Sequence, residues 1–262
     1  MKKYWAVFKV NLMRQYEHRF DNLFWFFCGL LPAFVNYVTW VAVYGDKKEI
    51  NGFQQTDLLT YFLVMAILWY IIGGTVSKYL GSSIKDGGIS AFIVKPIHPI
   101  LRYIFIEQGW KLGSLILIAP IFIVLLIVFN LKIPITSIEQ LLFLLVSMIL
   151  GATIFSLWDM IIGMCAFFIQ NVDPISRLNR ILFMLLSGQV FPVVLMPAWM
   201  AGINNLLFYR YTFAFSADII FTPDEINLPF MFGMQALWVI LIIIIFKLLY
   251  KFGIKKYEAY GA

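Results

Sequence analysis

Residues Leu237–Phe246 read LWVILIIIIF, an unbroken apolar run near the end of the chain. A helix with this composition is apolar on every side, which is typical of a helix surrounded by lipid. A strand of a membrane barrel would instead alternate in polarity. The run lies in a charge-free interval between Glu225 and Lys247, which is long enough to cross a hydrocarbon core about 30 Å thick. The sequence therefore predicts a membrane-spanning helix here.

The same character extends over the whole chain. Hydrophobic residues make up 62% of the 262 positions, charged residues make up 13%, and the mean hydropathy is +0.87. A soluble domain is about 25% charged, so this composition excludes a soluble enzyme, a disordered chain or a nucleic-acid-binding module. The intervals between charges predict an all-α polytopic membrane protein with one transmembrane domain over 1–262. The six expected spans are 24–44, 58–77, 112–131, 141–170, 181–200 and 228–247.

The distribution of lysine and arginine predicts the orientation. An even number of spans places both termini on one side, and the segments on that side hold 16 of the 20 basic residues. The opposite segments (45–57, 131–140 and 201–230) hold the other 4. Because basic residues collect in cytoplasmic loops, we expect both termini and the loops at 78–111 and 171–180 to be cytoplasmic.

The amino-terminal residues 1–21 have the pattern of an amphipathic helix. Aromatic and apolar side chains recur every three or four positions, namely Trp5, Phe8, Leu12, Tyr16 and Phe20. Such a helix lies in the membrane interface with its aromatic side chains at headgroup level. The alternative is a basic flank that only sets the orientation.

The loop at 78–111 is too apolar for a disordered linker. Gly87 and Gly88 indicate the end of a helix, and apolar residues follow at Ile89, Phe92, Ile93 and Ile97. Pro96 and Pro99 prevent one helix from continuing through them. The residues alone leave two interpretations open: a compact element that binds a protein partner, or a loop that lies flat on the membrane surface.

Asp159 is the only charge within the fourth apolar interval. A carboxylate inside a membrane is costly and indicates a function by default. Its distance from Glu139 places it about 30 Å along a helix, close enough to the inner interface to reach water. A structural or interfacial role and a role in a transport pathway both remain possible at this point.

The region after Arg180 contains two prolines where a straight span would end, Pro192 and Pro197. We expect the fifth span to stop near Pro192 and short helices to dip back into the outer leaflet over 192–221, because irregular backbone at membrane depth must be enclosed by protein. Six aromatic residues there fit an outer-interface cluster: Trp199, Phe208, Tyr209, Tyr211, Phe213 and Phe215.

Several kinds of catalytic or cofactor site find no support in the chain. The phosphate-binding motif G-x-x-x-x-G-K-[ST] is absent. The two histidines, His18 and His98, and the two cysteines, Cys28 and Cys165, are too few and too scattered for a zinc or haem centre. We therefore predict no catalytic residue, no metal site and no cofactor for this chain.

The chain resembles the permease subunits of ABC type 2 exporters, bacterial members of about 260 residues. The first cytoplasmic loop, IKDGGISAFIVKPIHPILR (84–102), is similar to the coupling element of that family. The residues Ser187-Gly188, Phe191-Pro192 and Met196-Pro197-Ala198-Trp199 are similar to its broken fifth span and re-entrant outer helices.

The resemblance implies a division of labour between subunits. Separate cytoplasmic ATPase subunits, which bind ATP and Mg²⁺, dimerise and move the spans of two permeases, identical or related, in the bacterial cytoplasmic membrane. The path between the permeases would be lined by the second and fifth spans. The coupling element would be formed by Ile84, Lys85, Asp86, Gly87, Gly88, Ile89, Phe92, Ile93, Lys95, Pro96, His98 and Pro99. The outer gate would be formed by Ser187, Gly188, Phe191, Pro192, Pro197 and Trp199.

These observations favour a non-enzymatic exporter subunit for an apolar or amphipathic substrate, since few polar groups lie in the spans. Membrane lipid is the expected surrounding, and no nucleic acid is expected as a partner. The alternatives are an ion-coupled carrier or channel that uses Asp159, and a membrane enzyme or assembly scaffold.

Overall fold

The computed structural model describes residues 2–93, 95, 97–169 and 171–257, and most of them are helical. A short hairpin (β1, Glu49–Ile50; β2, Phe53–Gln54) connects α2 to the 3₁₀ turn η1 (Gln55–Asp57). Three further 3₁₀ turns are η2 (Cys165–Phe167), η3 (Val193–Leu195) and η4 (Pro223–Glu225). The helices are α1 (Lys2–Glu17), α2 (Arg19–Tyr44), α3 (Leu58–Ile72), α4 (Val76–Lys85), α5 (Ser90–Ile93), α6 (Arg102–Val128), α7 (Ile138–Met164), α8 (Asp173–Leu186), α9 (Ala198–Asn204), α10 (Ala214–Phe221) and α11 (Leu228–Lys256).

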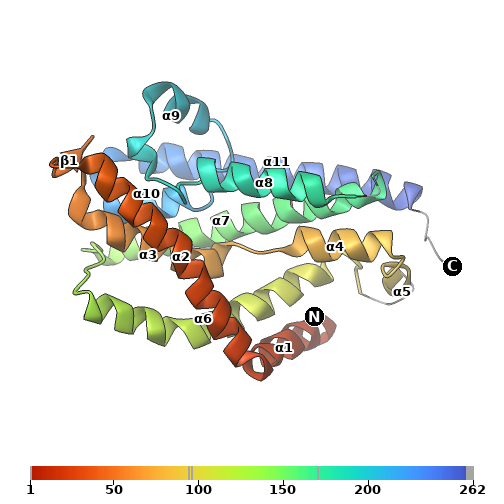
Figure 1. The fold of residues 1–262 in the computed structure, drawn as a ribbon. Coiled ribbons are helices and arrows are strands. Elements are labelled where there is room, and N and C mark those ends of the chain that lie inside the picture. Colours follow the sequence, from red (N-terminus) through yellow and green to blue (C-terminus); the bar gives the residue numbers. More distant parts are fainter. Residues whose placement is uncertain (1, 94, 96, 170, 258–262) are drawn as a thin grey trace.

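The prediction of an all-α polytopic membrane protein is confirmed. Within the described residues, 5 helical stretches are long and apolar enough to cross a membrane. Four of them are α2, α6, α11 and the pair α7–η2, and the fifth joins η1, α3 and α4 over Gln55–Lys85. Helix α7 lies in the middle of the bundle, with α11 along one side and the α3–α4 pair along another (Figure 1).

The expected span at 181–200 is wrong as a continuous helix. Helix α8 has 14 residues and ends at Leu186, well before the expected stop at Pro192. The chain turns at Gly188, whose φ of +83° lies in the left-handed region that favours glycine. The helix therefore ends because of a backbone turn, and Pro192 follows in chain that is already irregular.

The other spans differ from prediction mainly in their ends. Helix α6 begins at Arg102 and α11 continues to Lys256, each about ten residues beyond the expected limits of 112 and 247. The second span is interrupted at residues 73–75, between α3 and α4. The predicted spans end where charged residues occur. Glu107 and Lys111, however, are buried inside the bundle, so these charges do not mark the start of the third span.

The connections gather at the two ends of the bundle as the sequence predicts. The β1–β2 hairpin, the α6–α7 connection and α9 lie at one end, while α5, the α7–α8 connection and the last turn of α11 lie at the other (Figure 1). This division follows the two sets of segments that differ in basic residues. Their assignment to the two sides of a membrane stays a prediction.

The amino-terminal helix exists but is docked rather than free. Helix α1 packs against α6 at two glycines that leave no room for a side chain. A Cβ on Gly109 would lie 2.6 Å from the carbonyl oxygen of Phe8, and one on Gly113 would lie 2.7 Å from the Cβ of Gln15. Trp5 and Tyr16 remain 63% and 41% exposed, so the outer face of the helix keeps the aromatic character on which the interfacial prediction rests.

Candidate functional site

The loop at 84–98 is a folded element rather than an extended connection. Helix α4 ends at Lys85, and Gly87 turns the chain with a φ of +75°. Ile89 is fully buried, and the short helix α5 starts at Ser90. Because the apolar side chain is anchored, the loop is fixed to the helices beneath it.

Three contacts connect this loop to distant parts of the chain. The guanidinium carbon of Arg102 lies 3.6 Å from the centre of the Phe92 ring, in the geometry of a cation–π interaction. The backbone N–H of His98 donates to the hydroxyl of Tyr4 on α1 at 3.0 Å. The hydroxyls of Ser90 and Tyr257 lie 3.1 Å apart. These contacts join the loop directly to α1, α6 and the end of α11.

The predicted coupling residues divide into an anchored set and an exposed set. Ile84, Ile89 and Pro99 are buried, and Gly87, Phe92 and His98 are half-buried. Lys85, Asp86, Gly88 and Lys95 are exposed and form the surface available to a partner. Pro96 and the side chain of Ile93 lie outside the described residues.

The interruption of the second span is held by charged side chains of two neighbouring helices. The Nζ of Lys111 on α6 donates to the carbonyl oxygen of Ile72, the last residue of α3, at 2.9 Å. The carboxylate of Asp159 on α7 accepts the N–H of Ser77 in the first turn of α4 at 2.8 Å. A positive charge at the carboxyl end of α3 and a negative charge at the amino end of α4 both complement the helix dipole. The two half-helices are therefore capped from outside the span.

Glu107 completes this arrangement. Its Oε1 lies 3.2 Å from the Nζ of Lys111, and both side chains are almost fully buried. The carboxylate also fills the space beside Gly74, where a Cβ would lie only 1.7 Å from it. Any side chain at Gly74 would displace the ion pair, which explains why the interruption is built from glycine.

The expectation that Asp159 reaches water at the inner interface is wrong. The residue is 5% exposed, and its carboxylate is bonded to the backbone of α4. Asp159 lies near the end of α7, as its distance from Glu139 predicts. The position along one helix does not indicate that α4 covers its carboxylate. The geometry gives the carboxylate a structural role at the interruption of the second span.

The irregular segment after α8, residues 187–196, has its backbone satisfied by side chains from elsewhere. Four of them donate to its carbonyl oxygens: Tyr61 to Gly188 at 2.7 Å, Asn36 to Gln189 at 3.3 Å, Trp40 to Val190 at 3.1 Å and Asn51 to Val194 at 3.3 Å. They come from α2, α3 and the hairpin turn. Such bonds allow non-helical backbone to persist within a membrane protein.

The predicted outer-gate residues lie in or next to this segment. Ser187 and Pro192 are buried and Phe191 is half-buried, with its ring centre 6.0 Å from that of Trp40. Pro197 and Trp199 are exposed at the start of α9. The structure thus brings Gly188 against α3 and Phe191 against α2, buries Ser187 and Pro192, and leaves the last two positions at the surface.

The expected outer-interface aromatic cluster is mostly wrong. Trp199 is 71% exposed, but the five aromatic residues from Phe208 to Phe215 are each at most 7% exposed. They belong to the central core, where Phe213 stacks on Trp69 with ring centres 6.0 Å apart. The segment folds inward because the backbone turns of 205–213 pack it between α3, α7 and α8.

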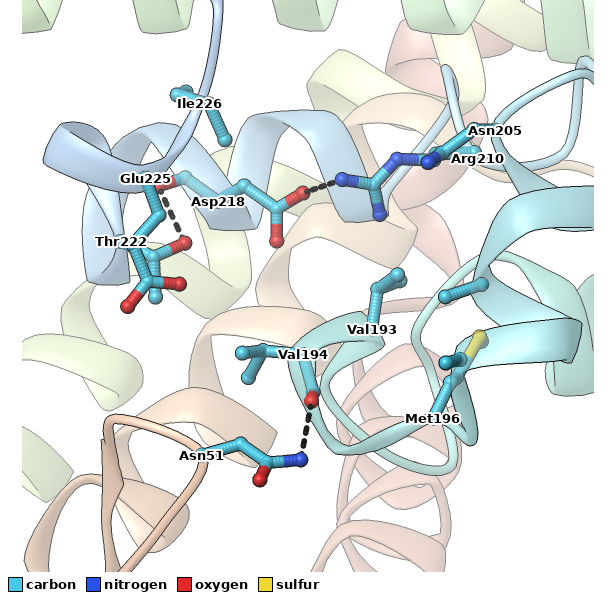
Figure 2. Close-up of a pocket in the computed structure, with 12 residues that line it drawn as sticks. Asn51, Val193, Val194, Met196, Asn205, Arg210, Asp218, Thr222, Glu225 and Ile226 are labelled. Carbon is cyan, nitrogen blue, oxygen red and sulfur yellow. Dashed lines mark hydrogen bonds and ion pairs between the residues drawn. The ribbon is translucent and has the colours of Figure 1, made fainter.

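A buried ion pair and a pocket lie beside this segment (Figure 2). Arg210 Nη2 and Asp218 Oδ2 are 2.9 Å apart, and the two side chains are 10% and 11% exposed. The pocket, of about 370 Å³, lies between η3 and α9 on one side and α10 and η4 on the other. Asn51 on the hairpin reaches its edge (Figure 2). Among the described residues, no group of three or more His, Cys, Asp or Glu side chains is suited to hold a metal ion.

Sequence reasoning missed the residues that hold the two interruptions. The charge of Lys111 favours a loop at that position, and Asn36, Trp40 and Tyr61 lie within apolar runs where a single polar group gives little signal. The sequence signal that could have identified these residues is an isolated hydrogen-bond donor within an otherwise apolar span. Their partners are backbone carbonyls, and a sequence does not indicate which carbonyls are unpaired.

Comparison with known proteins gives one family. Residues 30–261 match the family described as ABC-2 family transporter protein. No curated protein and no solved structure matches the chain.

Proposed function

Because the chain belongs to the ABC-2 transporter family, we propose that it is the permease subunit of an ATP-driven exporter for an apolar or amphipathic substrate. Membership covers most of the chain and supports a transport subunit rather than an enzyme. The export direction and the character of the substrate rest on the resemblance and on the apolar spans. The energy would come from an ATPase partner whose affinity differs between two conformations of this chain.

The observation that carries this proposal is the folded loop at 84–98. It presents Lys85, Asp86 and Lys95 to solvent while Ile89 anchors it beneath. A separate ATPase subunit would bind this exposed surface, and its movement would be passed on through Tyr4, Arg102 and Tyr257. The sequence left open whether this loop binds a protein partner or lies flat on the membrane surface. The anchored geometry favours binding to a protein partner.

The decisive experiment uses Gly87→Val in the full chain, co-expressed with a candidate ABC ATPase subunit. A branched side chain is strained at a φ of +75°, so we expect the loop to lose its shape and substrate-stimulated ATP hydrolysis to fall at least tenfold. Gly45→Val is the matched control, because Gly45 has a φ of +54° with open space around it at the opposite end of the bundle. Normal stimulation in Gly87→Val, or an equal loss in both variants, would contradict the proposal.

Pairing with a second permease is part of the proposal. The second span is the most enclosed of the five candidate spans, with 61% of its apolar window buried, whereas α2 has 6% buried. Helix α8 also exposes apolar side chains, among them Leu178 and Ile181. We propose that the second permease meets α2 and α8. The second span, expected from the resemblance to line the path, is largely covered within one chain.

Cysteine cross-linking in membranes tests this pairing. With Cys28 and Cys165 replaced by Ala, a cysteine at Leu31 on α2 or Leu178 on α8 is expected to form a disulfide-linked dimer. A cysteine at Ile127 on α6 is the control, because that side chain is also highly exposed (72%) but lies on a helix outside the proposed interface. Equal cross-linking at all three positions would indicate random collision.

We also propose that the end of the bundle carrying α5 faces the cytoplasm of a bacterial cell. Labelling with a membrane-impermeant thiol reagent tests this with two exposed lysines replaced by cysteine, Lys95 and Lys48, at opposite ends. In intact cells, Lys48→Cys is expected to react and Lys95→Cys to be protected. The reverse pattern would overturn the orientation and, with it, the site for the ATPase.

A further inference from the structure

The pocket beside the Arg210–Asp218 pair has a buried cation with unused hydrogen-bond donors on one wall. Arg210 is 8% exposed, and only its Nη2 meets a carboxylate. Its Nε and Nη1 have no hydrogen-bond partner among the described residues. Buried guanidinium nitrogens normally find acceptors, so Arg210 has two donors left over after its ion pair with Asp218.

The opposite wall carries negative charge. In Figure 2, Glu225 lies across the pocket from Arg210, and Asp218 lies between them. The side chain of Glu225 lies against the hairpin turn, since a Cβ on Gly52 would be 2.8 Å from its Oε1. These three are the charged residues lining the pocket in the described part of the chain, and their sum is one negative charge.

This charge pattern selects among ligands. A simple anion would meet the Arg210 donors but would face two carboxylates, and a simple cation would leave those donors unused. A ligand with an oxyanion and an ammonium group a few bonds apart satisfies both walls at once. The pocket volume of about 370 Å³ accommodates a compact zwitterion.

The surroundings indicate an amphipathic source for such a group. Val193, Val194 and Met196 form an apolar side of the pocket. Helix α9 lines it with Ala198 and Ala201 and exposes Trp199 and Ile203, 71% and 56%, to the surroundings. A headgroup in the pocket could thus have its hydrocarbon chain against α9.

We propose that this pocket binds a phosphoethanolamine-type zwitterion, with its phosphate at Arg210 and its ammonium at Glu225. Two sources share this chemistry: the headgroup of an aminophospholipid and a free zwitterion of the same kind. The site does not require the chain to be an exporter, so its test is separate from that of the proposed function.

The experiment measures binding to the purified full-length protein in detergent by calorimetric titration. Phosphoethanolamine is compared with ethanolamine and with methyl phosphate, each of which carries one of the two charges. We expect phosphoethanolamine to bind at least tenfold more tightly than either. Equal affinity for the three would overturn the proposal.

Glu225→Gln provides the sharper test, because it removes the ammonium partner and leaves the buried Arg210–Asp218 pair intact. We expect it to weaken phosphoethanolamine binding about tenfold and to leave methyl phosphate binding unchanged or stronger. Asp224→Asn is the matched control, since Asp224 is the exposed neighbour on the same turn, η4, and is not part of the pocket lining. An unchanged Glu225→Gln, or an equal loss in Asp224→Asn, would contradict the assignment.

Native mass spectrometry distinguishes the two sources. Retention of phosphatidylethanolamine in preference to phosphatidylglycerol, lost in Glu225→Gln, identifies the lipid headgroup as the ligand. Binding of soluble phosphoethanolamine without lipid preference identifies the free zwitterion. The absence of both kinds of binding overturns the proposal.

Discussion

The two interruptions of the helical backbone are held in different ways. At residues 73–75 the ends of α3 and α4 are capped by full charges, those of Lys111 and Asp159. At residues 187–196 the carbonyls accept bonds from the neutral side chains of Tyr61, Asn36, Trp40 and Asn51. The first interruption is three residues long between two helices, and the second is a longer irregular segment.

This difference has an energetic meaning. Removing one member of a buried ion pair leaves the other charge uncompensated and costs about 3–5 kcal/mol. Removing a neutral donor leaves one carbonyl unpaired and costs about 1–3 kcal/mol. By these magnitudes, disturbing the interruption in the second span costs more than disturbing the segment after α8.

The largest expected effect is that of Lys111→Met. The substitution leaves Glu107 buried without a counter-ion and the Ile72 carbonyl unpaired, so we expect a loss of about 3–5 kcal/mol in unfolding free energy. Chemical denaturation in detergent measures it. The double variant Glu107→Gln/Lys111→Met removes both charges and should recover part of the loss. If the double variant were no more stable than the single one, the cost would not come from an unpaired buried charge. The contrast with the neutral interruption at 187–196 would then fail.

Asp159→Ala is expected to rank second. It leaves the N–H of Ser77 without its acceptor and should cost about 1–3 kcal/mol, measured in the same way. Asp159→Asn keeps an acceptor oxygen and should retain most of the stability. It also addresses the ion-coupled alternative: substrate transport by Asp159→Asn should keep its dependence on pH and ions, and loss of that dependence would return Asp159 to the transport pathway.

Trp40→Phe examines the neutral interruption. It removes only the donor to Val190, so we expect a loss of about 1 kcal/mol together with greater labelling of residues 187–196 by water-soluble reagents. Trp5→Phe is the control, because Trp5 is 63% exposed on α1. If Trp40→Phe matched Lys111→Met in cost, the proposed contrast between the two interruptions would fail.

The features that the sequence predicts are those carried by average polarity. The runs that became α2, α6, α7 and α11 are apolar over a full crossing length, and lipid requires no specific partner for them. The division of the connections between the two ends also follows from a sum over many basic residues. The turn at the 84–98 loop was predictable because Gly87 and the two prolines act locally.

The features that it does not predict depend on a single distant partner. Lys111 belongs inside the bundle only because Glu107 and the Ile72 carbonyl are there to meet it. Phe213 and Tyr211 look like interface aromatics by composition, and only the packing around α3 and α7 makes them core. The early end of α8 depends on the φ of Gly188, which one sequence does not specify.

The smallest expected effect concerns His98, a neutral acceptor that can become charged. Its Nδ1 accepts the N–H groups of Ile100 and Leu101 at 3.3 and 3.2 Å, just before α6, and burial lowers its pKa. Because the folded state binds the proton less readily than the unfolded chain, stability is lost as the pH falls through the unfolded value of about 6.5 towards the folded pKa.

His98→Asn keeps an acceptor and removes the titration. We therefore expect thermal unfolding temperatures that match wild type at pH 8 and exceed it at pH 5.5, with His18→Asn as the control for the exposed histidine. A parallel pH dependence in wild type and His98→Asn would rule out a titrating cap. A divergence would show that the neutral His98 ring stabilises the start of α6. Protonation of Nδ1 would remove its ability to accept the N–H groups of Ile100 and Leu101, so this helix end would be stable only while the side chain is uncharged, unlike the ends of α3 and α4.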